Sequence, residues 1–183
     1  MFKSAPFFRI ASDFMLPPLE ALEEALQASR FIPCGTTQPE SSGWVAPRGN
    51  KSHALVEAVG RQLIVQLCTE RRPLPDSAVK AAVEERIEKF RQETGRDRIG
   101  ARIRKEFREA VILDLLPRAF TKRSSTTLWI DPVNKFLVVG TGSLAGADKV
   151  VSHLVDLLGE MPGVGPGIGV KPVQTSLSAA TAM

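Results

Sequence analysis

The sequence contains few of the residues that build disulfides and metal centres. Its 183 residues include only two cysteines, Cys34 and Cys68, and two histidines, His53 and His153. Neither cysteine belongs to a Cys-x-x-Cys pair or has a histidine beside it. We therefore expect two reduced thiols, and we expect no metal site because a zinc centre would need nearly all four residues at once.

Long apolar segments are also missing. No run approaches the roughly 20 apolar residues of a membrane-spanning helix. In residues 1–9 the charges are interleaved with aromatics, which is unlike the apolar core of about 7 to 15 residues in a secretory signal. We expect a cytoplasmic protein with one domain or two small ones, since 43% hydrophobic and 24% charged residues are ordinary values for a globular chain.

Hydrophobic periodicity predicts an alternation of hairpins and amphipathic helices. Strands are expected over 5–14, 43–45, 53–59, 62–69, 120–130 and 135–140, and helices over about 19–29, 77–95, 99–116 and 145–158. Asp76 or Ser77 is expected to cap the second helix, and Gly95 and Pro117 to end the second and third. Hairpins interrupted by helix pairs favour an α+β fold with a mainly antiparallel sheet.

The expected domain organisation follows from composition. Residues 1–158 form the α+β region, with 73–117 a helical pair that could be a subdomain. Residues 159–183 form a tail that is rich in glycine and proline at first and in serine, alanine and threonine later, and its end, Ser176–Met183, is expected to be poorly ordered.

The net charge of +4 is unevenly distributed. Residues 86–123 contain twelve basic and six acidic residues and so carry +6, while the rest of the chain carries −2. Nine of the twelve are arginines, whose planar guanidinium suits phosphate. An anionic partner is the first hypothesis, with nucleic acid before a membrane surface, and a merely solvated helix face is the alternative.

The segment from Leu115 to Thr127 combines features of a phosphate-binding turn. A helix ends at Pro117, and three cations, one aromatic residue and several hydroxyls follow it. Such groups bind phosphate or wedge against a base step. The alternative is a helix-end junction with Phe120 in the core.

Glycines between a predicted strand and helix resemble a dinucleotide-binding turn. Residues Gly140 to Ala145 fit the pattern G-x-G-x-x-A. A Rossmann unit needs a second parallel strand after that helix, whereas this chain enters a stretch rich in glycine and proline. A tight strand-to-helix connection is favoured, a nucleotide-dependent enzyme stays an alternative, and no cofactor or catalytic residue is expected.

Four sequence blocks resemble the recombination-associated RdgC family of bacteria. They are Phe31–Gly35, Gly43–Pro47, Leu115–Phe120 and Leu128–Asp131, in this order, and the resemblance covers roughly residues 1–175. It implies a non-enzymatic protein that binds duplex DNA with little sequence preference, associates with the nucleoid and restrains recombinase filament formation. Family members are dimers whose curved protomers close into a ring, and they are longer than this chain, which resembles their first part.

The sequence therefore predicts a non-specific duplex DNA-binding protein, a homodimer in its full-length form. An interaction module for an acidic partner protein is a further alternative. The residues expected to contact DNA are Arg96, Arg98, Arg102, Arg104, Lys105, Arg108, Arg118, Phe120, Lys122 and Arg123.

Overall fold

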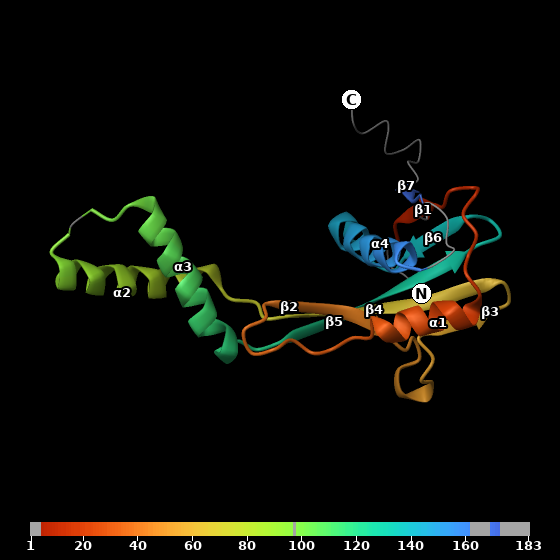
Figure 1. The fold of residues 1–183 in the computed structure, drawn as a ribbon, viewed down its shortest axis with the longest axis horizontal. Coiled ribbons are helices and arrows are strands. Elements are labelled where there is room, and N and C mark those ends of the chain that lie inside the picture. Colours follow the sequence, from red (N-terminus) through yellow and green to blue (C-terminus); the bar gives the residue numbers. More distant parts are fainter. Residues whose placement is uncertain (1–4, 97, 162–168, 173–183) are drawn as a thin grey trace, which may run out of the picture. The chain divides into compact units, whose positions relative to one another are not determined.

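A computed structural model describes residues 5–96, 98–161 and 169–172 of the chain. It contains four α-helices and a seven-stranded antiparallel sheet, which confirms the predicted α+β fold (Figure 1). The chain divides into two compact units. Unit 1 comprises residues 1–31, 42–68 and 124–183, and unit 2 comprises residues 32–41 and 69–123.

The sheet has the strand order β2-β4-β5-β6-β1-β7, and β3 pairs with β4. The strands are β1 (Phe7–Arg9), β2 (Glu40–Val45), β3 (Val56–Val59), β4 (Gln62–Arg71), β5 (Lys122–Asp131), β6 (Phe136–Val139) and β7 (Lys171–Pro172). Strands β3 and β4 form the predicted hairpin around Gly60 and Arg61. Gly60 takes the left-handed φ of 63° that a tight hairpin turn requires.

Two helices of unit 1, α1 (Leu19–Ala28) and α4 (Leu144–Gly159), lie against the strands of that unit (Figure 1). Their apolar stripes, Leu22 and Leu26 on α1 and Val150 to Leu158 on α4, belong to the same buried cluster as the inward-facing strand residues. In β1, β5 and β6 these inward residues include Phe8, Ile130 and Leu137, which follow the two-residue alternation of strands. One face of the sheet therefore packs on helices.

Unit 2 is built around the helices α2 (Asp76–Thr94) and α3 (Ala101–Leu115). Ile87 and Val111 are buried, and the rings of Phe90 and Phe107 meet edge to face with centroids 5.6 Å apart. Gly95 ends α2 as predicted, with a left-handed φ of 67° and its N–H donating to the Arg91 carbonyl. A short 3-10 helix, η2 (Leu116–Arg118), follows α3 at Pro117.

Several predictions about element ends were wrong. The strand predicted over 5–14 is limited to Phe7–Arg9, because the chain turns at Ala11, whose carbonyl accepts from the Phe14 N–H. The strand predicted over 43–45 begins at Glu40. The cap of α2 is Pro75, and no side chain caps the helix, because the Asp76 carboxylate instead pairs with Lys80 and Arg108.

The region predicted as a tail contains β7, which pairs with β1. The segment Ser176–Met183, predicted to be poorly ordered, lies outside the described residues. Both cysteines are buried as thiols.

Gly43 lies where two backbone segments of unit 1 meet. The Phe31 N–H donates to the Trp44 carbonyl and the Trp44 N–H donates to the Ser29 carbonyl, so the chain after α1 runs against β2. A Cβ at position 43 would stand only 2.4 Å from Phe31 Cα. Only glycine fits this contact without a shift of the backbone.

Gly43→Ala should therefore destabilise the protein by about 1 to 3 kcal/mol or more, the usual result of overpacking. Gly159→Ala is the matched control, because a Cβ at the end of α4 meets nothing within 4 Å. Urea unfolding of the two variants measures the difference. If the two variants are equally stable, the close approach of position 43 to the Phe31 backbone is contradicted.

Candidate nucleic-acid interface

Most basic residues of α2 and α3 form ion pairs on the surface of unit 2. Arg102 pairs with Glu106, Lys105 with Glu109, Arg104 with Glu84 and Arg108 with Asp76, at N–O distances of 3.0 to 3.8 Å. The side chains involved are about half exposed or more. Such pairs contribute only about 0 to 1 kcal/mol each, so a phosphate can replace the acid at little cost.

Four predicted residues make no ion pair within the part of the chain that the structure describes: Arg96, Arg98, Arg118 and Lys122. Arg96 and Arg98 lie in the loop between α2 and α3, and both are exposed. Arg118 ends η2 and Lys122 begins β5, and both are also exposed. These cations hold unused positive charge, which the paired arginines do not.

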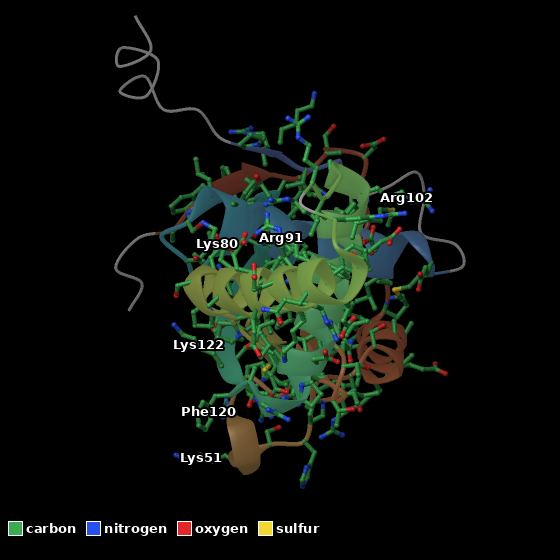
Figure 2. All side chains as sticks on the ribbon, turned by 90° about the vertical axis from the view of Figure 1, so that its left-hand side faces the viewer. Lys51, Lys80, Arg91, Arg102, Phe120 and Lys122 are labelled. Carbon is green, nitrogen blue, oxygen red and sulfur yellow. The ribbon has the colours of Figure 1, made fainter. Side chains whose placement is uncertain are left out.

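Phe120 lies between two of these cations and is 92% exposed. This value excludes the alternative that placed Phe120 in the core. Figure 2 shows Phe120 and Lys122 pointing outward on the same side of the view. A phenylalanine that is 92% exposed between two cations offers a ligand both a flat ring and positive charge, which makes residues 118–122 the strongest candidate contact segment.

The ten predicted residues do not share one face. Figure 2 shows Arg102 on the opposite side of the view from Phe120 and Lys122. The structure therefore separates the predicted set into the contact segment 118–122, the loop cations Arg96 and Arg98, and the paired cations of α3.

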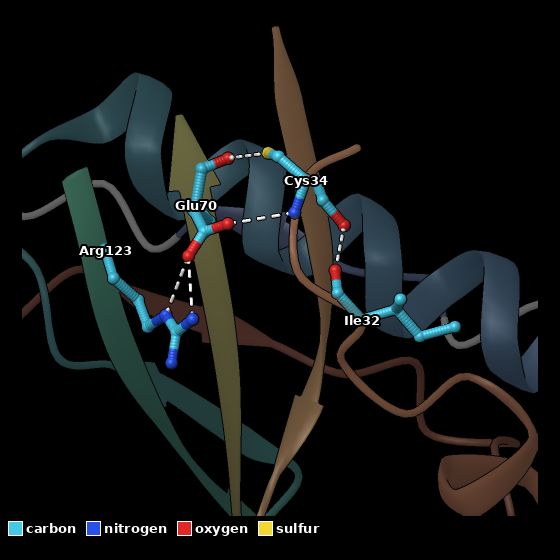
Figure 3. A network of polar contacts seen from close by, with 5 residues as sticks. Ile32, Cys34, Glu70 and Arg123 are labelled. Atoms are coloured by element: carbon cyan, nitrogen blue, oxygen red, sulfur yellow. Dashed lines mark hydrogen bonds and ion pairs between the residues drawn. The ribbon is translucent and has the colours of Figure 1, made fainter. Parts of the chain in front are cut away.

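Arg123 differs from its neighbours because it holds a buried carboxylate (Figure 3). Its Nε and one terminal nitrogen donate to one oxygen of Glu70 at 3.0 and 2.7 Å. The other oxygen of Glu70 accepts from the Cys34 N–H at 2.8 Å, and the Cys34 thiol donates to the Glu70 carbonyl. Glu70 is 3% exposed, so this network joins β4, β5 and the loop after α1 inside unit 2.

The same network sets the ionisation of Glu70. The hydrogen bonds from Arg123, with the further bond from the Cys34 N–H, hold the pKa of Glu70 below its ordinary value although burial opposes this. Because the folded-state pKa is lowered, the stabilisation is present at neutral pH and is lost as the pH falls through that pKa.

Arg72 is a positioning residue that sequence reasoning missed. Its guanidinium donates to the carbonyls of Leu116 and Ala119 at 3.4 and 3.0 Å, which holds the chain just before Phe120. Arg72 follows a strand and precedes a proline, and no local pattern indicates these bonds, which span 44 and 47 residues.

The glycine turn at residues 140–145 is a strand-to-helix connection. Ser143 caps α4 by accepting from the Gly146 N–H at 3.2 Å, and the Thr141 hydroxyl accepts from the Ser143 N–H. The strand after α4 within the described residues, β7, pairs antiparallel with β1, whereas a dinucleotide fold needs a parallel strand. The turn therefore gives no support to nucleotide binding.

The described residues show neither a cluster of metal ligands nor a membrane-spanning helix. They contain no group of three or more His, Cys, Asp or Glu side chains placed to hold a metal ion. None of their helices is long and apolar enough to cross a membrane.

An antiparallel α+β fold in which residues 118–122 carry two cations beside an exposed ring defines a candidate nucleic-acid-binding protein. The chain belongs to the RdgC family, whose model, described as "Putative exonuclease, RdgC", matches residues 1–183. This confirms the resemblance seen in the sequence.

Two relatives show the extent of the match. The recombination-associated protein RdgC of Dechloromonas aromatica (strain RCB) is 38% identical over 161 residues, which are 88% of this chain and 52% of the relative. The recombination-associated protein RdgC of Enterobacter sp. (strain 638) is 33% identical over 177 residues, 97% of this chain and 57% of the relative. The chain spans about half the length of these curated relatives.

Arg123→Gln should lower the melting temperature by several degrees at pH 7, because it leaves the buried Glu70 carboxylate without its cation. The deficit should shrink as the pH falls through the lowered folded-state pKa of Glu70, because the carboxylate is then protonated in the parent protein as well. Calorimetry from neutral to acidic pH measures the deficit, with Lys122→Gln as the control in the same strand. A deficit that is independent of pH would contradict the proposed role of Arg123.

Proposed function

We propose that this protein binds duplex DNA without sequence preference, through the phosphate backbone and chiefly through unit 2. The observation that carries the proposal is the contact segment, where Arg118 and Lys122 lie on either side of the 92% exposed Phe120 and have no acidic partner among the described residues. Cations in this arrangement bind phosphates, and an exposed ring can press against the sugar edge or a base step.

The paired cations of α2 and α3 form a second group of proposed contacts, separate from the contact segment. Their partners are carboxylates on the same or the facing helix, and exposed pairs of this kind exchange readily with other anions. Arg102, Arg104, Lys105 and Arg108 add contacts of this second kind. The loop cations Arg96 and Arg98, which make no ion pair among the described residues, add contacts of the first kind. Arg123 is already engaged by Glu70, and we propose that it contributes to DNA binding mainly by holding the start of β5.

The wider role follows from the family. We propose that the full-length protein is a nucleoid-associated, non-enzymatic homodimer that limits recombinase filament formation on DNA. The name of the relatives supports a role in recombination. The family description also names an exonuclease. Incubation of labelled duplex with this chain and Mg²⁺ distinguishes a binding protein from an exonuclease. Shortened strands would contradict a purely binding role.

Binding to two unrelated duplexes should be about equal and should weaken steeply with salt, because each neutralised phosphate contributes about −0.9 to the slope of log K against log salt. The double variant Arg118→Glu and Lys122→Glu should make this slope shallower by about 2. Fluorescence anisotropy at several salt concentrations measures it. A preference above about tenfold for one duplex would contradict backbone binding.

The matched control for this variant is Lys51→Glu with Arg61→Glu. It exchanges the same two residue types at exposed positions of unit 1 and so has the same effect on net charge. It should leave the slope almost unchanged. Equal loss in both double variants would mean that net charge alone governs binding. If neither variant affects DNA binding but an acidic protein binds this face, the interaction-module alternative holds.

Phe120→Ala should weaken binding to every duplex by about tenfold, or about 1.4 kcal/mol, and leave the melting temperature unchanged, since the ring has no packing to lose. Gel shifts and thermal unfolding of the same preparation measure both quantities. Light scattering over a hundredfold dilution then distinguishes a direct DNA contact from a contact between protomers. A lower melting temperature with normal DNA binding would contradict the proposal.

A further inference from the structure

A groove lies between α1 and the end of α4 in unit 1. Both helices lie against the strands of that unit (Figure 1). The groove has a volume of about 410 Å³, within the range of roughly 300 to 1,000 Å³ that is usual for binding pockets. Its residues are distinct from the contact segment 118–122 and from the basic helices of unit 2.

The groove exists because α1 presents small side chains to it. Ala21, Ala25 and Ala28 line the groove, and their spacing of four and three residues places them on one face of the helix. The larger Leu22 and Leu26 of the same helix belong to the buried core instead. Leucines at the alanine positions would fill this space, so the sequence of α1 keeps the groove open.

The floor of the groove is apolar. Leu157, near the end of α4, is only 5% exposed, and Met161 packs against the core cluster while it lines the groove. The unbranched thioether of methionine adapts to different shapes, which suits a surface that receives the side chains of a partner. An apolar side chain that enters the groove would leave water for a hydrophobic surface.

The charged residues in the described lining are both acidic. They are Glu24 on α1 and Glu160 just after α4, and both are exposed. Neither forms an ion pair with another residue that the structure describes. Glu23 differs from them because its carboxylate accepts from the N–H groups of Leu55 and Val56 at 2.9 to 3.0 Å. Glu24 and Glu160 therefore keep their charge available for a cation.

Two helix C-termini reach the same groove. Ser29 is the C-cap of α1 and Glu160 is the C-cap of α4, and both line it. A helix C-terminus carries a partial negative charge that a basic side chain in the last turn offsets, but neither last turn contains one. Arg30 follows the cap of α1 and is not among the lining residues. The helix dipoles therefore add to the two carboxylates, and the groove attracts cations and repels phosphates.

We propose that this groove binds a basic amphipathic helix of a partner protein, with its apolar side chains between α1 and α4 and its lysines or arginines at Glu24 and Glu160. Helix-in-groove recognition needs an apolar floor and complementary charge at the edges, and the groove offers both. A nucleic acid would bring phosphates toward two carboxylates. An uncharged apolar ligand would leave both carboxylates without a cation.

NMR of the full chain labelled with ¹³C at the methionine methyl groups tests this proposal. The probe is a synthetic helix of about 14 residues with leucines at positions i, i+3, i+4 and i+7 and lysines beside them. The Met161 signal, assigned with a Met161→Leu variant, should shift more than that of Met15, which is 82% exposed and does not line the groove. A peptide with glutamates in place of the lysines should bind at least tenfold more weakly. No shift of Met161, or equal binding of the two peptides, would overturn the proposal.

Charge variants test the two carboxylates. The double variant Glu24→Gln and Glu160→Gln should weaken binding of the lysine peptide about tenfold, because it removes both acids of the groove. The matched control is Glu20→Gln with Asp148→Asn, which removes two exposed carboxylates from the same helices at positions that do not line the groove. The control should leave the affinity unchanged. Equal losses in both double variants would mean attraction by overall charge, and the groove would not be the site.

A steric variant tests the occupant. Ala28 is exposed at the end of α1, so Ala28→Trp should fill the groove and weaken binding of the lysine peptide at least tenfold without lowering the melting temperature. If the lysine peptide does not bind and Ala28→Trp instead changes the mass measured by light scattering, a second copy of this chain occupies the groove and the proposal is wrong. Duplex binding by all these variants should equal that of the parent chain, so failure of this proposal leaves the proposed function of unit 2 intact.

Discussion

The buried carboxylate of Glu70 is the interaction on which unit 2 depends. One of its oxygens accepts from Arg123 at the start of β5, and the other accepts from the Cys34 N–H. A carboxylate that is 3% exposed persists as a charged group only if such donors surround it. By fixing the start of β5, the pair also fixes the point at which the contact segment leaves the sheet.

A second restraint acts on the other end of that segment. Arg72 follows β4 and donates to the carbonyls of Leu116 and Ala119, so the chain is anchored immediately before Phe120 as well as after it. An exposed ring on a freely moving loop would lose conformational entropy on binding. Between two anchored ends, Phe120 and its flanking cations lose less, which makes the segment suited to bind although it is only a few residues long.

Local sequence signals predicted the elements well, and tertiary contacts explain what they missed. The hairpin at Gly60 and Arg61, the end of α2 at Gly95 and the break at Pro117 all follow from residues whose backbone preferences act locally. The position of the basic segment, residues 86–123, could also be predicted, because it depends only on composition.

The roles of individual basic residues could not be predicted from the sequence. Arg118, Lys122 and Arg123 are equivalent in the sequence, yet only Arg123 reaches Glu70, 53 residues away. In the same way, Asp76 matches the pattern of a cap but pairs with Arg108 on the next helix. Whether Phe120 is core or surface depends on what packs beside it, and no spacing rule supplies that information.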